Sequence, residues 1–145
     1  MKSRPDHLVA RLLLAPTLVL AAAVLVKGFA QVGDGFAAGA IAALGIMMVF
    51  VAFGRADAER LLPVGGLAAT AVAGIGIAFL VAFVPPLLGR PILAHSPGPG
   101  EEVVHLGTLE LLTTVVFDLG IALLVVGAVT AALALIARVA ERRDP

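Results

Sequence analysis

The sequence contains no cysteine, tryptophan or tyrosine, and only 14% of its 145 residues are charged. The lack of cysteine excludes disulfides, thiolate nucleophiles and thiolate metal sites. Ten basic and ten acidic residues cancel, so the charge balance does not indicate a nucleic-acid partner, which would require a basic surface. The missing Trp and Tyr remove the aromatic belt typical of membrane interfaces, which favours a small subunit surrounded by protein neighbours.

The sequence is rich in long hydrophobic runs. Hydrophobic residues make up 61% of the chain and the mean hydropathy is +1.10, whereas soluble domains are about 45–50% apolar. A helix needs about 20 apolar residues to cross a bilayer. Runs of this kind predict four spans, at residues 8–26, 35–53, 64–88 and 109–137. We therefore predict an all-α integral membrane protein, with residues 1–145 forming one four-helix domain in the lipid bilayer.

The basic residues predict the orientation of these spans. Eight of the ten lie in the N-terminal segment, after the second span or in the C-terminal tail, and the other two lie in the remaining loops. The first group comprises Lys2, Arg4, Arg11, Arg55, Arg60, Arg138, Arg142 and Arg143, and the second comprises Lys27 and Arg90. Because basic residues favour the cytoplasmic side, both termini are predicted to be cytoplasmic and the loops around Gly33 and Pro97 external.

The first hydrophobic run has an alternative interpretation as a signal peptide, with Gly28-Phe29-Ala30 as its cleavage site. The run is long for the hydrophobic region of a signal peptide. Its removal would also leave three spans and disrupt the alternation of charge, so we expect it to be a transmembrane helix.

Asp118 is the main candidate for a functional residue, because it lies within the apolar run 111–137. A carboxylate within a spanning helix is unfavourable by about 2.5–3.5 kcal/mol on insertion scales, so it is expected to face protein or water. Thr114 lies one turn earlier on the same predicted face, and Glu110 two turns earlier, nearer the surface. Asp118 either belongs to an ion pathway or bonds a neighbouring helix, and the sequence leaves both roles open.

Asp34 is a second candidate, in the first predicted external loop. Flanking glycines, Gly33 and Gly35, are typical of a tight turn that leads into the second span. Asp34 would attract cations at an entrance or, as we favour, start the helix, where a carboxylate suits the positive end of the helix dipole.

The remaining polar residues do not indicate an enzyme, a metal site or a cofactor. His95, Glu101, Glu102 and His105 gather in the longest predicted loop, but their spacing matches no known ligand pattern. The cluster from Arg55 to Arg60 is interpreted as a solvated cytoplasmic turn. Neither a nucleophile–base pair nor a phosphate-binding loop is recognisable, so the chain is predicted to be neither a catalyst nor a cofactor-binding protein.

Small residues recur every fourth position on the two middle spans, a spacing that lets membrane helices approach closely. The stripe on the second span comprises Gly35, Gly39 and Ala43, and that on the third comprises Gly66, Thr70, Gly74, Ala78 and Ala82. We expect Gly39 and Gly74 to be packing positions. Pro85 and Pro86 are expected to end or kink the third span, and Pro16 to kink the first.

Five short motifs in register resemble the MnhB (or MrpB) family, whose members are small subunits of the Mrp-type multisubunit sodium/proton antiporters. The motifs are Lys27-Gly28, Val32-Gly33-Asp34-Gly35-Phe36, Gly89-Arg90-Pro91-Ile92-Leu93, Phe117-Asp118-Leu119-Gly120 and Val125-Val126-Gly127. The family residues matched include Gly33, Gly35, Phe36, Pro91, Phe117, Gly120 and Gly127. The family usually has a proline at the position of Val32 and a glycine at that of Asp34.

This resemblance implies a small accessory subunit of a complex that exchanges monovalent cations, Na⁺ above all, for protons, driven by the proton-motive force. Its implied partners are the large antiporter-like subunits and the other small membrane subunits of the complex, in the plasma membrane of a prokaryote. The subunit would contribute to assembly and to the cation route.

Two alternatives stay open. Related subunits occur in membrane-bound hydrogenases, so the chain would serve as a structural or assembly subunit of such a complex, with no part in ion movement. A self-sufficient small transporter acting as an oligomer is the other, although Asp118 would be its single clearly intramembrane charge.

Overall fold

The computed structural model describes residues 4–28, 33–62, 66–94, 105–106, 109–110 and 113–143, with backbone alone at 4–7, 105–106, 109–110 and 143. Five α-helices and two very short strands lie in these ranges. The helices are α1 (Arg4–Lys27), α2 (Asp34–Phe53), α3 (Arg55–Leu61), α4 (Leu67–Leu87) and α5 (Thr113–Arg143), and the strands are β1 (His105–Leu106) and β2 (Leu109–Glu110).

Within the described residues, four helices are long and apolar enough to cross a membrane. Their apolar parts are Leu8–Lys27, Asp34–Phe53, Leu67–Leu87 and Thr113–Arg142. The prediction of a helical membrane fold with four candidate spans is thereby confirmed.

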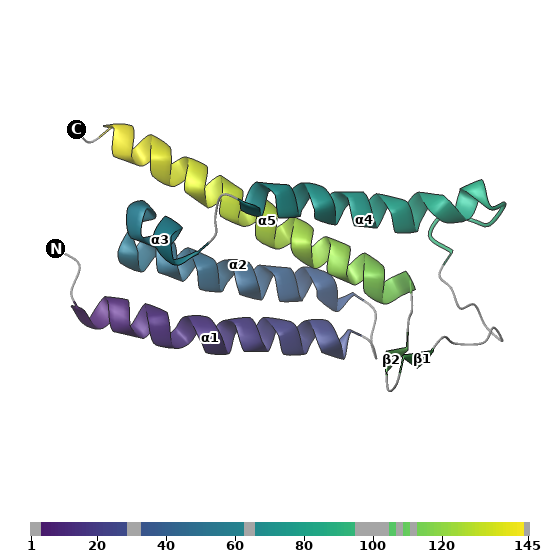
Figure 1. Ribbon diagram of the computed structural model, residues 1–145, viewed down its shortest axis with the longest axis horizontal. Helices are drawn as coiled ribbons and strands as arrows, with labels where there is room; N and C mark the ends of the chain where they lie inside the picture. Colours follow the sequence, from purple (N-terminus) through teal and green to yellow (C-terminus); the bar gives the residue numbers. More distant parts are fainter. Residues whose placement is uncertain are drawn as a thin grey trace.

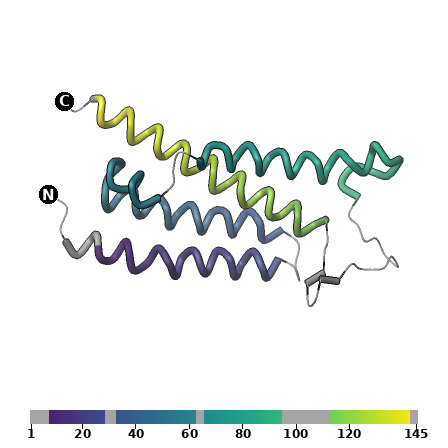
Figure 2. Tube along the Cα trace, in the orientation of Figure 1, coloured from purple at the N-terminus to yellow at the C-terminus, as the bar shows by residue number. Residues whose placement is uncertain are grey.

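The four long helices lie side by side in the order α1, α2, α5, α4 (Figure 1). α1 packs on α2, α2 on α5, and α5 on α4, while α5 runs obliquely across the bundle (Figures 1 and 2). α5 has 31 residues and is therefore about 46 Å long, against about 30 Å for the hydrocarbon core. Its oblique course and its projecting C-terminal turns accommodate this excess.

Glycines set the close helix crossings, because a Cβ atom there would collide with the neighbouring backbone. A Cβ on Gly39 of α2 would lie 2.8 Å from the Ala122 carbonyl oxygen of α5. A Cβ on Gly74 of α4 would overlap the backbone of α5 at Leu124. Gly127 of α5 meets α4 in the same way. In contrast, Gly66 is exposed and meets no such neighbour, so the small-residue stripe of α4 begins to pack only further along the helix.

The start of the last span differs from the sequence prediction in a way that affects the candidate site. The fourth helix begins at Thr113 rather than at residue 109, because Leu109–Glu110 pairs with His105–Leu106 as an antiparallel ladder. Glu110 therefore does not lie on the helix of Asp118, and its predicted position two turns before Asp118 is wrong.

The predicted solvated turn at Arg55–Arg60 is also wrong, because these residues form the helix α3. Gly54 has a φ of +79°, which allows the chain to turn directly after α2. Ala58 is then completely buried against Val49 and Phe50 of α2. Burial of this small apolar face fixes α3 against the bundle.

The expected end of the third span near Pro85 and Pro86 is confirmed, whereas the kink expected at Pro16 stays a prediction. α4 ends at Leu87, directly after Pro85 and Pro86, and Pro16 lies inside α1. Proline lacks the N–H that continues a helix, which accounts for the end of α4.

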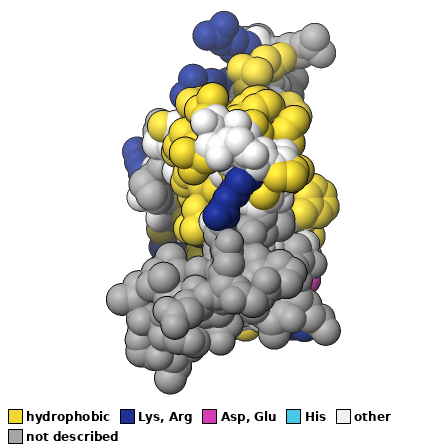
Figure 3. Space-filling view, turned by 90° about the vertical axis from the view of Figure 1, so that its right-hand side faces the viewer, with side chains coloured by type: hydrophobic (Ala, Val, Ile, Leu, Met, Phe, Trp, Pro, Cys, Tyr) yellow, Lys and Arg dark blue, Asp and Glu magenta, His cyan; other side chains and the backbone are white. Residues whose placement is uncertain are grey.

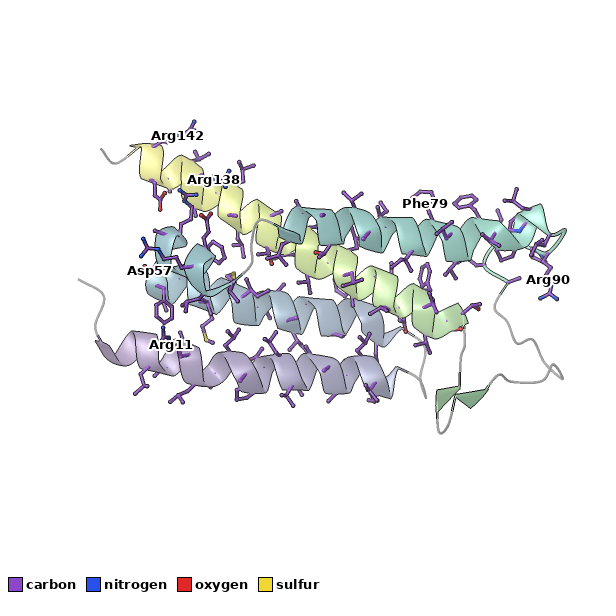
Figure 4. The ribbon with its side chains drawn as sticks, in the orientation of Figure 1. Arg11, Asp57, Phe79, Arg90, Arg138 and Arg142 are labelled. Carbon is purple, nitrogen blue, oxygen red and sulfur yellow. The ribbon has the colours of Figure 1, made fainter. Side chains whose placement is uncertain are left out.

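The charged side chains that Figure 4 labels lie at the two ends of the bundle. Arg11, Asp57, Arg138 and Arg142 lie at the end that contains α3, and Arg90 lies at the opposite end. Arg55 donates hydrogen bonds to Glu59 at 3.0 Å and to Glu141 of α5 at 2.8 Å. The bond to Glu141 is the largest cause that raises the pKa of the Arg55 guanidinium above its ordinary value. The guanidinium of Arg11 lies 5.7 Å from the ring centre of Phe53, a cation–π contact.

Candidate functional site

Asp118 is buried in the bundle, with 5% of its surface exposed. Its Oδ2 atom accepts a hydrogen bond of 3.1 Å from the backbone N–H of Gly33. The two residues are 85 positions apart in sequence. The carboxylate of α5 is therefore bound by the backbone that leads into α2, and we call this region the Asp118 junction, formed by Lys27, Gly28, Gly33, Asp34, Gly35 and Asp118.

Glycines make room for the carboxylate at the end of α1. Gly28 is buried, and a Cβ atom on it would lie 3.5 Å from Asp118 Oδ2 and 3.3 Å from Asp34 Cβ. The same atom would lie only 2.9 Å from the carbonyl oxygen of Leu25. Gly33 has a φ of +107°, a conformation that side-chain-bearing residues rarely adopt. Both glycines therefore allow the backbone to surround the acid.

Gly35 brings α2 into direct contact with the backbone of α5. A Cβ atom on Gly35 would overlap the carbonyl group of Asp118. Because this obstacle is backbone rather than a flexible side chain, the first turn of α2 and the Asp118 turn of α5 are fixed against each other.

Asp34 is the first residue of α2, and its carboxylate lies 3.7 Å from the ammonium group of Lys27 at the end of α1. The side chain of Lys27 is mostly exposed, whereas that of Asp34 is 24% exposed. Asp34 Oδ2 is itself buried and has no hydrogen-bond partner within the part of the chain that the structure describes. An acidic group here also suits the positive end of the α2 dipole.

Of the remaining predicted polar candidates, the structure describes the side chain of Thr114 alone. Thr114 is buried one turn before Asp118 on α5. Glu110 lies in β2, and its side chain is outside the described residues. His95, Glu101 and Glu102 are also outside the described residues, as is the side chain of His105.

The family-motif residues divide into packed and exposed positions. Gly120 and Gly127 lie at the crossing of α5 with α4, since a Cβ on either would meet α4 backbone within 3.1 Å. Phe36 and Pro91 are exposed and Phe117 is partly buried. Phe36 borders an apolar groove of about 420 Å³ between α2 and α5.

The arrangement provides two carboxylates and one ammonium group at a junction of three helices. Acids within a membrane face protein interiors or water pathways, so a site of this kind is a candidate for balancing a cation. Among the residues that the structure describes, no three His, Cys, Asp or Glu side chains are grouped so as to hold a metal ion.

Reasoning from the sequence did not identify Lys27 or Gly28 as site residues. The two residues form one of the family motifs and Lys27 is also one of the loop charges, but the burial of Gly28 depends on the return of α5 to the end of α1. Thr130 was not identified either. Its hydroxyl is completely buried and has no hydrogen-bond partner among the described residues. A polar residue within the apolar run of α5 is the signal that Thr130 shares with Asp118.

The sequence also matches a known protein family over most of its length. The family is described as a domain related to the MnhB subunit of Na⁺/H⁺ antiporters, and the match covers residues 7–131. The chain belongs to the MnhB family. This confirms the resemblance drawn from the short motifs.

Individual members of the MnhB family give the same result. A Na⁺/H⁺ antiporter subunit of Bacillus subtilis is 36% identical over 95 residues, which cover 66% of this chain and 65% of that protein. The chain therefore matches slightly less than two thirds of that relative's length. A protein of Staphylococcus haemolyticus, provisionally named antiporter subunit mnhB2, is 32% identical over 109 residues, or 73% of this chain and 74% of that protein. Its counterpart in Staphylococcus saprophyticus is 32% identical over 97 residues, covering 67% of each.

Proposed function

We propose that this chain is an accessory membrane subunit of a multisubunit Na⁺/H⁺ antiporter driven by the proton-motive force, in the plasma membrane of a prokaryote. Membership of the MnhB family and the named relatives support this role. The chain acts with large antiporter-like subunits and other small membrane subunits, and it is a transporter component rather than an enzyme.

Both termini face the cytoplasm in this proposal. The gathering of Arg11, Arg138 and Arg142 at one end of the bundle supports it, because basic residues favour the cytoplasmic side (Figure 4). The Asp118 junction then lies toward the external side of the membrane.

Asp118 carries the functional part of the proposal, as a fixed charge beside the cation route. The observation behind it is a 5% exposed carboxylate in a membrane helix, hydrogen-bonded to the backbone N–H of Gly33 and placed beside the Lys27–Asp34 pair. A carboxylate accepts several hydrogen bonds, so this acid retains oxygen lone pairs that can face a cation.

Asp118→Asn tests this role, because asparagine keeps an oxygen to accept the Gly33 N–H but loses the charge. Na⁺-dependent collapse of the pH gradient is measured in everted vesicles that contain the assembled complex. We expect a lower initial rate with unchanged assembly. Asp57→Asn is the control, since Asp57 is an exposed acid at the opposite end.

Wild-type transport by a fully assembled Asp118→Asn complex would refute the ionic role. Loss of the complex in Asp118→Asn, with Asp57→Asn intact, would instead assign Asp118 to packing.

A second candidate function is a structural scaffold with no part in ion movement, including one in a hydrogenase-type complex. The close crossing of α4 and α5 at Gly74 favours it. In that case Gly74→Leu abolishes assembly, whereas Gly76→Leu, on the same helix with open space around it, leaves assembly intact. Neutralising Asp118 would then leave both transport and its pH dependence unchanged.

A further inference from the structure

The long helices around Asp118 have no polar side chains over several turns toward the end of the bundle that contains α3, here called the α3 end. On α5, residues 119–129 are all apolar or glycine, and Thr130 is the next polar residue. Residues 35–53 of α2 and 18–26 of α1 are also all apolar or glycine. The rise along α5 from Asp118 to Thr130 is about 18 Å. Over this length no side chain of these helices can replace the water around an ion.

Backbone contacts close both flanks of α5 at and just after Asp118. On the α2 side, a Cβ atom on Gly35 would overlap the carbonyl group of Asp118. On the α4 side, a Cβ atom on Gly74 would overlap the backbone of Gly120 and Leu124. A water molecule needs about as much room as such a carbon atom, so water does not pass between α5 and either neighbour at these contacts.

Two grooves run along α5 beyond Asp118, and both are apolar. One of about 220 Å³ lies among α1, α2 and α5, where Leu25, Leu119 and Ala122 are among its lining residues. The other, of about 420 Å³, lies between α2 and α5, and Ala43 and Val129 help to line it. Every residue that lines either groove is apolar or glycine. Apolar cavities in proteins stay dry, and hydrophobic constrictions exclude ions by losing their water.

Charged groups accompany Asp118 on its other side, toward the Asp118 junction. The exposed fraction rises from 5% at Asp118 to 24% at the side chain of Asp34 and 62% at that of Lys27. A Cβ atom on Gly28 would lie 3.5 Å from Asp118 Oδ2 and 3.3 Å from Asp34 Cβ, so the two acids are neighbours. Figure 3 views the bundle from this end, and very little acidic surface is visible among the described side chains, in keeping with the burial of Asp118.

We propose that water and cations reach Asp118 from the junction side of the membrane only, because a dry barrier about 18 Å long separates it from the α3 end. An ion that reaches Asp118 then leaves by the same side or passes sideways into another subunit. The chain is therefore a dead end rather than a complete pathway, which argues against a self-sufficient transporter. The consequence for transport rests on the proposed role of Asp118, whereas the side of access does not.

The lack of cysteine allows a direct test with single introduced thiols. Asp118→Cys is placed in the assembled complex, in right-side-out and everted vesicles, and treated with a membrane-impermeant cationic methanethiosulfonate. The mass of the isolated chain then gives the rate of modification from each side. Lys27→Cys and Arg60→Cys mark the two sides, since these side chains are 62% and 82% exposed and lie at opposite ends. Ala122→Cys, one turn farther along α5 and 7% exposed, is the matched control.

We expect Asp118→Cys to react about tenfold faster, or more, from the side that modifies Lys27→Cys than from the side that modifies Arg60→Cys. The reason is that the reactive thiolate forms where water is present. Ala122→Cys should react slowly from both sides, although Ala122 and Asp118 are almost equally buried.

Equal modification of Asp118→Cys from both sides, or faster modification from the Arg60 side, overturns the proposal. Absence of reaction from either side also overturns it, as does ready modification of Ala122→Cys from the Arg60 side. If Asp118→Cys does not assemble, Thr114→Cys replaces it, since Thr114 is buried one turn nearer the junction, and the same results support or overturn the proposal. Transport is not measured here, so a failure is distinguishable from failure of the antiporter role, which Asp118→Asn tests.

Discussion

The two ends of the bundle use the same kinds of charged residue in opposite ways. At the α3 end, Arg55 bonds Glu59 and Glu141 with side chains that are 25–50% exposed. At the Asp118 junction, the acid is 5% exposed and its hydrogen-bond donor is the backbone of Gly33 rather than a basic side chain.

From this difference we expect that burial, rather than the number of ion pairs, decides how much a charge contributes to stability. Exposed ion pairs contribute about 0–1 kcal/mol, because water and salt screen them. A buried carboxylate must be satisfied by its surroundings, and a backbone donor held by close helix contacts does this without adding a second charge. We therefore expect substitutions of the buried residues of the Asp118 junction to have larger effects than those of the exposed residues at the α3 end.

Gly35→Leu should give the largest effect, because its side chain would have to occupy space held by the backbone of Asp118. Overpacking typically costs about 1–3 kcal/mol, and an immovable backbone obstacle should raise the loss in the free energy of unfolding above that range. Unfolding in SDS, followed by circular dichroism, measures this loss.

Gly76→Leu is the matched control, since a Cβ there meets nothing within 4 Å. If both variants lose the same stability, the contact of α2 with Asp118 is not what holds the junction.

Asp118→Leu should have the next largest effect, because it removes the acceptor of the Gly33 N–H. A hydrogen bond to a charged group contributes about 1.5–3 kcal/mol, so Gly33 should exchange its amide hydrogen roughly ten- to a hundredfold faster. Hydrogen exchange of the peptide that covers residues 33–36 measures this. Asp118→Asn should retain most of the protection, and an Asn variant as fast as the Leu variant would show that the charge, rather than the acceptor, holds the loop.

Much of the fold could be predicted because membrane helices follow local rules. Hydrophobic length predicted the four spans, and the burial of Gly39 and Gly74 accords with the spacing of small residues. The strand at Glu110 and the helix α3 could not be predicted, because both depend on what the backbone or Ala58 meets in the folded chain.

The candidate site was predictable only in part. An acid in an apolar run drew attention to Asp118, but nothing local indicates that its partner is the N–H of Gly33, 85 residues away. The pairing of Lys27 with Asp34 is equally a consequence of how α1 and α2 meet.

Arg55→Gln should lower stability only slightly, although it removes two ion pairs at the α3 end, because exposed ion pairs are screened by water and salt. The loss should shrink in high salt, because exposed charges are screened within about 10 Å at 0.1 M ionic strength. SDS unfolding at two salt concentrations measures both quantities. A loss as large as that of Asp118→Leu, unchanged by salt, would remove the distinction between the two ends.

Lys27→Gln should have the smallest effect, below about 0.5 kcal/mol, although Lys27 lies at the junction itself. Its ammonium group is 3.7 Å from Asp34 and its side chain is 62% exposed, so water replaces it readily. The same unfolding measurement, with Arg60→Gln as an exposed control at the other end, tests this expectation. Lys27→Gln could instead lose several times as much stability as Arg60→Gln. The buried oxygen of Asp34 would then depend on Lys27. Proximity to the junction, rather than exposure of the side chain, would set the strength of an ion pair.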